Sequence, residues 1–520
     1  MPFLWLYAIV NNKIAETKEK CVDKGDWFMR KCGMLLPVSS LPSKYGIGAF
    51  SKEAYEWIDL LKRAGQHYWQ ILPLGPTGYG DSPYQSFSSF AGNPYFIDLE
   101  ELVREDLISA EQCDLQNFGE DASSVDYEKI YEGRYPLLRQ AYGSWKAKGN
   151  SSKEVIETLS EETVWFCFYM ALKDHFQGKS WIHWDEDIRL KKEEAVEYYK
   201  KLLTDEMGFY IFLQFKFWEQ WNKLKGYAGE QGIRIIGDLP IYVSFDSADA
   251  WGHPELFQFD ENGYPEAVAG CPPDAFSATG QLWGNPLYRW DYHKDTGYEW
   301  WLKRLEYSFR LYDTVRVDHF RGFDEYYRVP AGREDAMVGT WEKGPGIQLF
   351  LRLKERFGDL DIIAEDLGFL TPSVLNLLSE TGFPGMKVLE FAFDANGESI
   401  YLPHNYSKNC VVYTGTHDNQ TLRSWYEDLS EADRNFSRRY LNNYNTPDDE
   451  ICWDFIRLAL ASVADLAVIP VQDYLGTGRN GRINEPSTLG NNWKWRLRSG
   501  EITEDLVNKC RELAFLYGRK

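Results

Sequence analysis

Eight short apolar runs, spread along most of the chain, are the feature that most restricts its fold. Each has the length and the β-branched or aromatic content of a buried strand, and helical stretches separate them. Eight alternating strand and helix units are typical of an α/β protein with a closed (β/α)8, or TIM, barrel. The predicted strands are Cys32 to Leu36, Tyr68 to Leu72, Arg234 to Ile236, Thr314 to Val317, Asp361 to Ala364, Met386 to Ala392, Val411 to Thr414 and Leu466 to Val471.

The uneven spacing of these runs indicates insertions in the barrel. Helical, aromatic-rich stretches separate the second and third runs, so we predict a helical insertion at about 100–230. A segment rich in Gly, Pro and aromatic residues at about 243–292 predicts a lid-like loop after the third strand, and a smaller insertion at about 327–346 follows the fourth. Residues 29–520 thus form the predicted catalytic barrel, and residues 1–28 an N-terminal extension of unknown role.

Three carboxylates follow predicted strands directly or within a few residues. Asp318 follows Thr-Val-Arg-Val, Glu365 follows Asp-Ile-Ile-Ala, and Asp418 ends Val-Val-Tyr-Thr-Gly-Thr-His-Asp. The carboxyl ends of the strands of a barrel meet at one face, so we expect these side chains to converge on one pocket. A converging pair of Asp or Glu residues is the minimal machinery for breaking a glycosidic bond.

The neighbours of two of these carboxylates suggest different roles. Residues two apart in a strand share a face, so Arg316 and Asp318 point the same way, and we expect Arg316 to lower the pKa of Asp318 and keep it anionic, as a nucleophile. A structural ion pair inside the barrel is an equally good interpretation of the tripeptide alone. Glu365 follows an apolar run, where burial is expected to raise its pKa and let it serve as a general acid.

His417 and Asp418 follow the seventh predicted strand. A His-Asp pair there can bind sugar hydroxyls, and the carboxylate can stabilise an oxocarbenium-like transition state. Hydrolysis by a Ser-His-Asp triad is the rival interpretation, but no Gly-x-Ser-x-Gly elbow is present, and no Gly-x-x-x-x-Gly-Lys-[Ser/Thr] phosphate loop occurs either.

Composition limits the partners and the compartment. The net charge of −22 repels polyanions, and no apolar run is long enough to span a membrane, so we expect neither nucleic acid nor membrane as a partner. The 8 cysteines form no CxxC pair and do not cluster with histidines, which favours reduced thiols, a cytoplasmic enzyme, and no metal or other cofactor.

Longer motifs resemble a known family. Gly237-Asp-Leu-Pro-Ile, Arg316-Val-Asp-His-Phe-Arg-Gly, Ala364-Glu-Asp-Leu-Gly and Thr416-His-Asp-Asn are similar to the conserved regions of the alpha-amylase superfamily. The segments Ser82 to Pro94 and Gly270 to Trp290 resemble, more narrowly, the 4-alpha-glucanotransferase family, also called amylomaltase or disproportionating enzyme. The resemblance runs from about Met29 to the C-terminus. Residues 1–28 have no counterpart, and Gln420 stands where an acidic residue often follows His-Asp-Asn.

The resemblance implies a role for each matching position. It makes Asp318 the nucleophile, Glu365 the acid/base and Asp418 the residue that stabilises the transition state. The positions that match substrate contacts are Tyr84, Asp238, Arg316, His417, Asn484 and Pro486, together with Asp274, Gln281 and Trp283 on the loop that closes over the site.

The resulting hypothesis is a retaining transglycosylase that acts on alpha-1,4-glucans and malto-oligosaccharides by double displacement. Retention requires the two reacting carboxyl groups to be about 5 to 5.5 Å apart. The three carboxylates do not distinguish a sugar acceptor from water, so transfer is implied mainly by the resemblance. An alpha-glucan hydrolase of the same superfamily is the alternative, and a catalytically silent carbohydrate-binding protein is the alternative from another class. The oligomeric state is not predicted.

Overall fold

A computed structural model describes residues 30–78, 80–273 and 277–520, and its centre is a closed barrel of parallel strands. The neighbouring strands around the barrel are β1-β12-β11-β10-β9-β6-β3-β2, with β2 next to β1. The predicted TIM barrel is confirmed, and each of the eight predicted strands has its counterpart. The strands are β1 (Lys31–Leu35), β2 (Tyr68–Gln70), β3 (Arg234–Leu239), β6 (Thr314–Val317), β9 (Ile362–Ala364), β10 (Gly385–Val388), β11 (Cys410–Tyr413) and β12 (Leu466–Pro470).

The sixth predicted strand is too long at its carboxyl end. The strand β10 ends at Val388, and the next residues form a short 3-10 helix, η8 (Leu389–Phe391). The side chain of Glu390 within this turn is 8% exposed. The apolar residues of this segment continue through Leu389, Phe391 and Ala392, so they do not mark where the buried strand gives way to a turn.

Local sequence explains the helices around the barrel. In α2 (Lys52–Arg63) the residues Ala54, Trp57, Ile58 and Leu61 recur at helical spacing, and all four are buried. The helix α15 (Pro372–Thr381) has Pro at its first position, and the side chain of Thr371 accepts a hydrogen bond from the N–H of Val374. The residue after its last turn, Gly382, has a left-handed φ of 72° and caps the helix. The other helices of this layer are α13 (Glu299–Leu311), α14 (Ile347–Phe357), α16 (Leu422–Asp428), α17 (Glu431–Leu441), α18 (Cys452–Ala461), α19 (Val471–Tyr474) and α20 (Glu504–Leu516).

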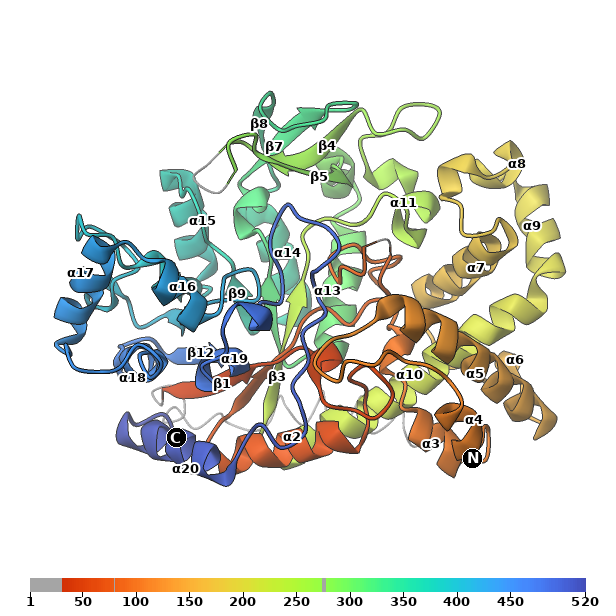
Figure 1. The fold of residues 1–520 in the computed structure, drawn as a ribbon. Coiled ribbons are helices and arrows are strands. Elements are labelled where there is room, and N and C mark those ends of the chain that lie inside the picture. The colour runs from red at the N-terminus through yellow and green to blue at the C-terminus, as the bar shows by residue number, and fades with distance from the viewer. Residues whose placement is uncertain (1–29, 79, 274–276) are drawn as a thin grey trace.

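A helical region lies between β2 and β3, as predicted, and occupies the right of the view in Figure 1. The 27-residue helix α10 (Thr204–Glu230) runs from this region to β3, and its aromatic side chains Phe209, Phe217 and Trp221 are fully buried. The other helices of this region are α3 (Leu99–Arg104), α4 (Ala110–Asp114), α5 (Tyr127–Ala147), α6 (Ser152–Val155), α7 (Glu161–His175), α8 (Glu186–Arg189) and α9 (Glu193–Leu202).

A second sheet, which we call the cap sheet, lies at the top of the view in Figure 1. Its strands are β4 (Ala267–Cys271), β5 (Gln281–Pro286), β7 (Glu325–Pro330) and β8 (Thr340–Lys343), in the order β5-β4-β7-β8. The pairs are antiparallel, and β4 joins β7 with Ala267 opposite Pro330. The segments after the third and fourth barrel strands, which the sequence presents as separate insertions, therefore share one sheet. The short helices α11 (Ala248–Gly252) and α12 (Trp290–Asp295) flank β4 and β5 in the chain.

Candidate active site

Three neighbouring barrel strands carry acidic residues at their carboxyl ends. Asp238 lies within β3, Asp318 follows β6 and Glu365 follows β9, and these strands are adjacent in the barrel. The backbone ladder continues past the strand ends, because the N–H of Asp318 donates to the carbonyl of Leu239 and the N–H of Glu365 to that of Val317, both at 3.0 Å. The two acidic residues are therefore held by the sheet itself rather than by a free loop.

Arg316 connects Asp238 and Asp318. It lies opposite Asp238 in the register of β3 and β6, and its Nη1 donates to both carboxylate oxygens of Asp238 at 2.7 Å. The same nitrogen lies 3.1 Å from Oδ1 of Asp318. Arg316 and Asp238 are buried, whereas the side chain of Asp318 is 27% exposed, so a ligand can reach Asp318.

The expectation that Arg316 keeps the pKa of Asp318 low is wrong. Burial raises the pKa of Asp318 to about 7 although Arg316 lowers it, and the nearby carboxylates of Asp238 and Glu365 also raise it. One guanidinium faces several carboxylates here, and Asp238 takes the larger share of it. Asp318 therefore exchanges a proton near neutral pH.

Glu365 is held by backbone donors. Its Oε2 accepts from the N–H of His319 and its Oε1 from the N–H of Leu367, each at 2.8 Å. Burial raises the pKa of Glu365 above its ordinary value, although Arg316 and these two N–H groups lower it. Asp318 and Glu365 are thus two buried carboxyls with raised pKa values, and the charge of Glu365 contributes to the raised pKa of Asp318.

The third carboxylate is held differently. Asn484 donates a hydrogen bond of 2.6 Å from Nδ2 to Oδ1 of Asp418, and Nε2 of His417 lies 3.3 Å from Oδ2. Although burial raises it, the charge of His417 and these contacts lower the pKa of Asp418 to about 2. Burial lowers the pKa of His417 but Asp418 raises it, and the net direction is upward. Asp418 therefore stays ionised in the pH range in which Asp318 exchanges its proton.

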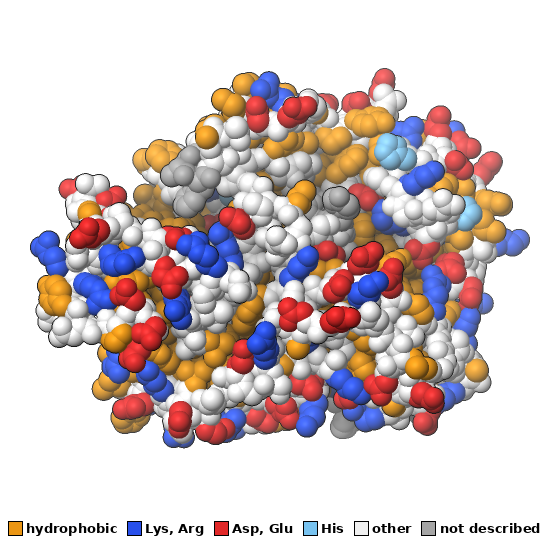
Figure 2. All heavy atoms as spheres, viewed as in Figure 1, with side chains coloured by type: hydrophobic (Ala, Val, Ile, Leu, Met, Phe, Trp, Pro, Cys, Tyr) orange, Lys and Arg blue, Asp and Glu red, His pale blue; other side chains and the backbone are white. Residues whose placement is uncertain are grey.

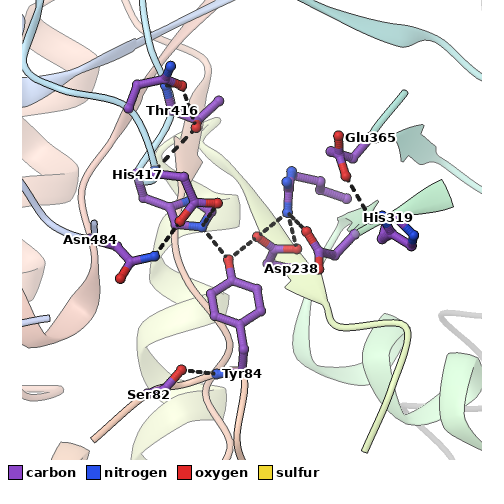
Figure 3. A network of polar contacts seen from close by, with 12 residues as sticks. Ser82, Tyr84, Asp238, His319, Glu365, Thr416, His417 and Asn484 are labelled. Carbon is purple, nitrogen blue, oxygen red and sulfur yellow. Dashed lines mark hydrogen bonds and ion pairs between the residues drawn. The ribbon is translucent and has the colours of Figure 1, made fainter. Parts of the chain in front are cut away.

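Tyr84 connects the two groups of charged residues. Its hydroxyl donates to Oδ2 of Asp238 at 2.8 Å and lies 2.8 Å from Nε2 of His417. Its ring stacks on His417 with centroids 5.3 Å apart and an interplanar angle of 15°. In Figure 3, Tyr84 and His417 lie to one side of Asp238. Glu365 and His319 lie on its other side.

The remaining predicted substrate residues lie at the edge of this network. Gln281 and Trp283 share a face of β5, and Nε1 of Trp283 donates to Oε1 of Gln281 at 3.2 Å. Trp283 meets the ring of His319 edge to face at 4.8 Å, which places the cap sheet against the loop after Asp318. Pro486 is exposed, two residues beyond Asn484 in the chain. Asp274 lies outside the described residues.

Three residues of the site were not predicted from the sequence. His319 has a left-handed φ of 48°, and its N–H and ring contact Glu365 and Trp283, respectively. Burial lowers the pKa of His319 to about 3, so its imidazole is neutral. The ring of Trp493 lies 5.6 Å from that of Tyr84, and Arg482 donates to the carbonyl oxygen of Asp418 at 3.2 Å. The position of His319 directly after Asp318 was a usable signal, whereas the other two come from a loop that only the fold brings here.

Within the described ranges, no group of three or more His, Cys, Asp or Glu side chains is placed to hold a metal ion. None of the helices in that part of the chain combines the length and the apolar character that crossing a membrane requires.

The comparisons with known proteins all indicate the same family. The model of the family described as 4-alpha-glucanotransferase matches residues 36–503. The 4-alpha-glucanotransferase of Clostridium butyricum is 47% identical over 93% of this chain and 99% of that protein, and that of Thermus thermophilus is 45% identical over 93% and 98%. The solved structure of the amylomaltase from Streptococcus agalactiae in complex with acarbose is similar with a TM-score of 0.92 and 41% identity, covering 94% of this chain and 99% of that one.

Proposed function

The chain belongs to the 4-alpha-glucanotransferase family, and from this we propose that it transfers alpha-1,4-glucan segments from a malto-oligosaccharide donor to the 4-hydroxyl of an acceptor glucan or glucose. The proposed mechanism is a double displacement with retention at the anomeric carbon. The observation that supports it is the meeting of Asp318 and Glu365 at the ends of adjacent strands, with their pKa values raised together.

In the first displacement, the ionised carboxylate of Asp318 attacks the anomeric carbon of the donor. The bond between that carbon and the glycosidic oxygen breaks, and Glu365 gives its proton to the leaving oxygen. The product is a glycosyl group bound to Asp318 and a released shorter sugar. This step requires a charged Asp318 and a neutral Glu365, and the burial that raises the pKa of Glu365 favours its protonated form.

In the second displacement, Glu365 acts as the base. It takes the proton from the 4-hydroxyl of the incoming acceptor, whose oxygen attacks the anomeric carbon and displaces Asp318. An alpha-1,4 bond forms, and the enzyme returns to its starting protonation state. The backbone N–H groups of His319 and Leu367 hold the Glu365 carboxylate in one orientation while it is charged.

The other residues support the charge that develops on the sugar ring. We assign to Asp418 the stabilisation of the oxocarbenium-like transition state, because His417 and Asn484 hold its pKa low and fix its oxygens. Tyr84, Asp238, Arg316 and His417 are assigned to the donor sugar, and Gln281, Trp283, Asp274, Asn484 and Pro486 to further substrate contacts.

Transfer in preference to hydrolysis requires that an acceptor sugar, and not water, meets the glycosyl intermediate. The contact between Trp283 of the cap sheet and His319 supports a role for this sheet in excluding water and orienting the acceptor. The proposed organisation keeps residues 29–520 as one catalytic unit with insertions at about 100–230, 243–292 and 327–346, and leaves the role of residues 1–28 open.

We propose a cytoplasmic location with glucans, and neither nucleic acid nor membrane, as partners. The cysteines Cys32, Cys113, Cys167, Cys410, Cys452 and Cys510 are buried thiols, which suits a reducing compartment. The net charge of −22 disfavours polyanionic partners.

Incubation with maltotriose alone tests the proposal. A transferase releases glucose and forms oligosaccharides longer than the substrate, whereas an alpha-glucan hydrolase gives shorter products only. The substitutions Asp318→Asn and Glu365→Gln should each lower turnover by about 10⁴-fold or more, as loss of a nucleophile or acid/base commonly does.

A matched control is available at the other end of the barrel. Asp361 lies just before β9, and its exposed carboxylate pairs with Arg234 at 2.6 Å. The variant Asp361→Asn should keep the wild-type product pattern. Full activity in Asp318→Asn would contradict the assignment and favour a silent carbohydrate-binding protein contaminated by another enzyme.

A further inference from the structure

Two exposed aromatic side chains lie next to the loops that follow Asp318 and Glu365. Phe369 is 79% exposed and is four residues beyond Glu365, which limits its distance to about 14 Å along an extended chain. Trp341 is on β8 of the cap sheet and is 39% exposed. Figure 2 shows hydrophobic side chains gathered over the cap sheet, at the top of the view. A single exposed ring has no special meaning, so the connection between these two is what matters.

Arg321 connects the two rings. Its guanidinium lies 3.9 Å from the centroid of the Trp341 ring, and its Nη1 donates to the carbonyl oxygen of Phe369 at 2.7 Å. Arg321 is 7% exposed and lies in the short helix η7 (Phe320–Phe323), three residues after Asp318. Trp341 also packs against Tyr327 of β7, with centroids 5.2 Å apart. One buried cation thus holds the backbone of Phe369 and stacks on the ring of Trp341.

The position of these rings relative to the proposed chemistry indicates which part of the substrate they face. Tyr84 and His417 lie on one side of Asp238 and are assigned to the donor sugar, whereas Glu365 lies on the other side (Figure 3). Glu365 exchanges its proton with the leaving group and then with the acceptor. Phe369 follows Glu365 in the same loop, and Arg321 connects this loop to Trp341. We therefore assign both rings to the side of Glu365, at which the leaving group departs and the acceptor enters.

We propose that Phe369 and Trp341, fixed by Arg321, form a platform for the distal sugar units of a malto-oligosaccharide acceptor and so set the preference for acceptor length. This proposal rests on the proposed function and names a specificity determinant of the same site. Rigid aromatic faces bind the apolar faces of sugar rings with little loss of conformational entropy. The outer units of a long acceptor gain this contact, and a glucose acceptor is too small to reach it.

The test compares acceptors of different length with a common donor. The ratio of kcat/KM for maltopentaose as acceptor to that for glucose is measured in wild type, Phe369→Ala and Trp341→Ala. Each substitution should lower this ratio roughly 3- to 10-fold, the range expected for the loss of one aromatic contact. Trp341→Phe, which keeps an aromatic face, should have a ratio closer to the wild-type value than Trp341→Ala has.

Phe515 provides the matched control. It is 65% exposed on α20, which lies at the bottom of the view in Figure 1, away from the cap sheet. Phe515→Ala should leave the ratio at its wild-type value. A ratio that is unchanged in Phe369→Ala and Trp341→Ala would overturn the proposal. This includes the case in which kcat/KM falls equally for glucose and maltopentaose, since that indicates a positioning role. Failure of the proposed function would be seen separately, because the wild-type protein would then form no products longer than maltotriose.

Discussion

Arg316 binds Asp238 and Asp318 through the same nitrogen, and Asp238 holds it more closely, with both oxygens at 2.7 Å against 3.1 Å for Asp318. Asp238 and Arg316 are almost completely buried. The barrel interior thus contains a buried ion pair, and its guanidinium also contacts Asp318, the proposed nucleophile. The partition of one positive charge between two carboxylates determines both the stability of this part of the barrel and the protonation of Asp318.

Removal of Asp238 should destabilise the fold strongly. In Asp238→Ala the buried guanidinium of Arg316 loses its main partner, which commonly costs about 3 to 5 kcal/mol of unfolding free energy. Chemical denaturation followed by circular dichroism measures the change. Asp361→Ala breaks the exposed pair with Arg234 and should cost no more than about 1 kcal/mol. Equal losses in the two variants would show that burial of the Arg316 pair has no energetic consequence.

Asn484→Ala should lower kcat about 10- to 100-fold, and its loss as a substrate contact should also raise KM. It removes the 2.6 Å hydrogen bond to Asp418, and a bond to a charged group contributes about 1.5 to 3 kcal/mol. The effect on kcat arises because Asp418 is assigned to the transition state. Steady-state kinetics with maltotriose separates the two constants. Asn492→Ala in the same loop, where the amide binds the backbone at Glu485 and Thr488, is the control and should be neutral.

The activity should depend on pH as a bell with an acidic limb near neutrality. Asp318 must be ionised, so the active fraction rises as pH rises through its pKa of about 7, well above the ordinary value of about 4. Glu365 must carry a proton, so activity falls as pH rises through the pKa of Glu365, which burial raises above its ordinary value. The profile of kcat/KM for maltotriose from pH 4 to 9 reports both groups in the free enzyme.

A substitution distinguishes the cause of the acidic limb. The charge of Asp238 raises the pKa of Asp318, so Asp238→Asn should move the acidic limb to lower pH. Asp418 has a pKa of about 2 and should not contribute to the profile. An acidic limb near pH 4 in the wild-type enzyme would contradict the raised pKa of Asp318.

Two glycine substitutions should change stability in opposite directions. A Cβ at Gly237 would lie 2.1 Å from ring carbons of the buried Tyr312, so Gly237→Ala should destabilise by about 1 to 3 kcal/mol. A Cβ at Gly226 has no neighbour within 4 Å, and this exposed position in α10 gains helix propensity. Gly226→Ala should therefore stabilise by about 0.5 to 1 kcal/mol. Thermal unfolding of both variants measures the two changes in stability and tests whether they have opposite directions.

The barrel was predictable because its strands are short, apolar and separated by clear turn or helix signals. Their side chains are mostly buried on both faces, so the strands are visible in the sequence as short, largely apolar runs. The cap sheet was not predictable in the same way. The pairing of β4 with β7 joins segments separated by a barrel strand, and no local periodicity records which strands pair.

The site was predictable to the extent that its residues follow strands. Asp318 and Glu365 do, and the motifs of the family mark His417 and Asp418. The pKa of Asp318 was predicted in the wrong direction, because the effect of Arg316 was visible in the sequence while the burial and the competing Asp238 were not. Trp493 and Arg482 reach the site from the loop after β12, and only the closed barrel brings that loop beside Tyr84 and Asp418.

The division of the cap sheet between two chain segments limits how this enzyme can be re-engineered. Residues 267–286 and 325–343 supply its two halves, and the barrel strand β6, which Asp318 follows, lies between them in the chain. A cap taken from another family member would have to be grafted as two matched pieces. A single grafted half would meet a foreign partner along the β4–β7 seam, where mismatched strands leave N–H and C=O groups without partners. Changes of acceptor specificity by loop exchange therefore require both halves to be exchanged together.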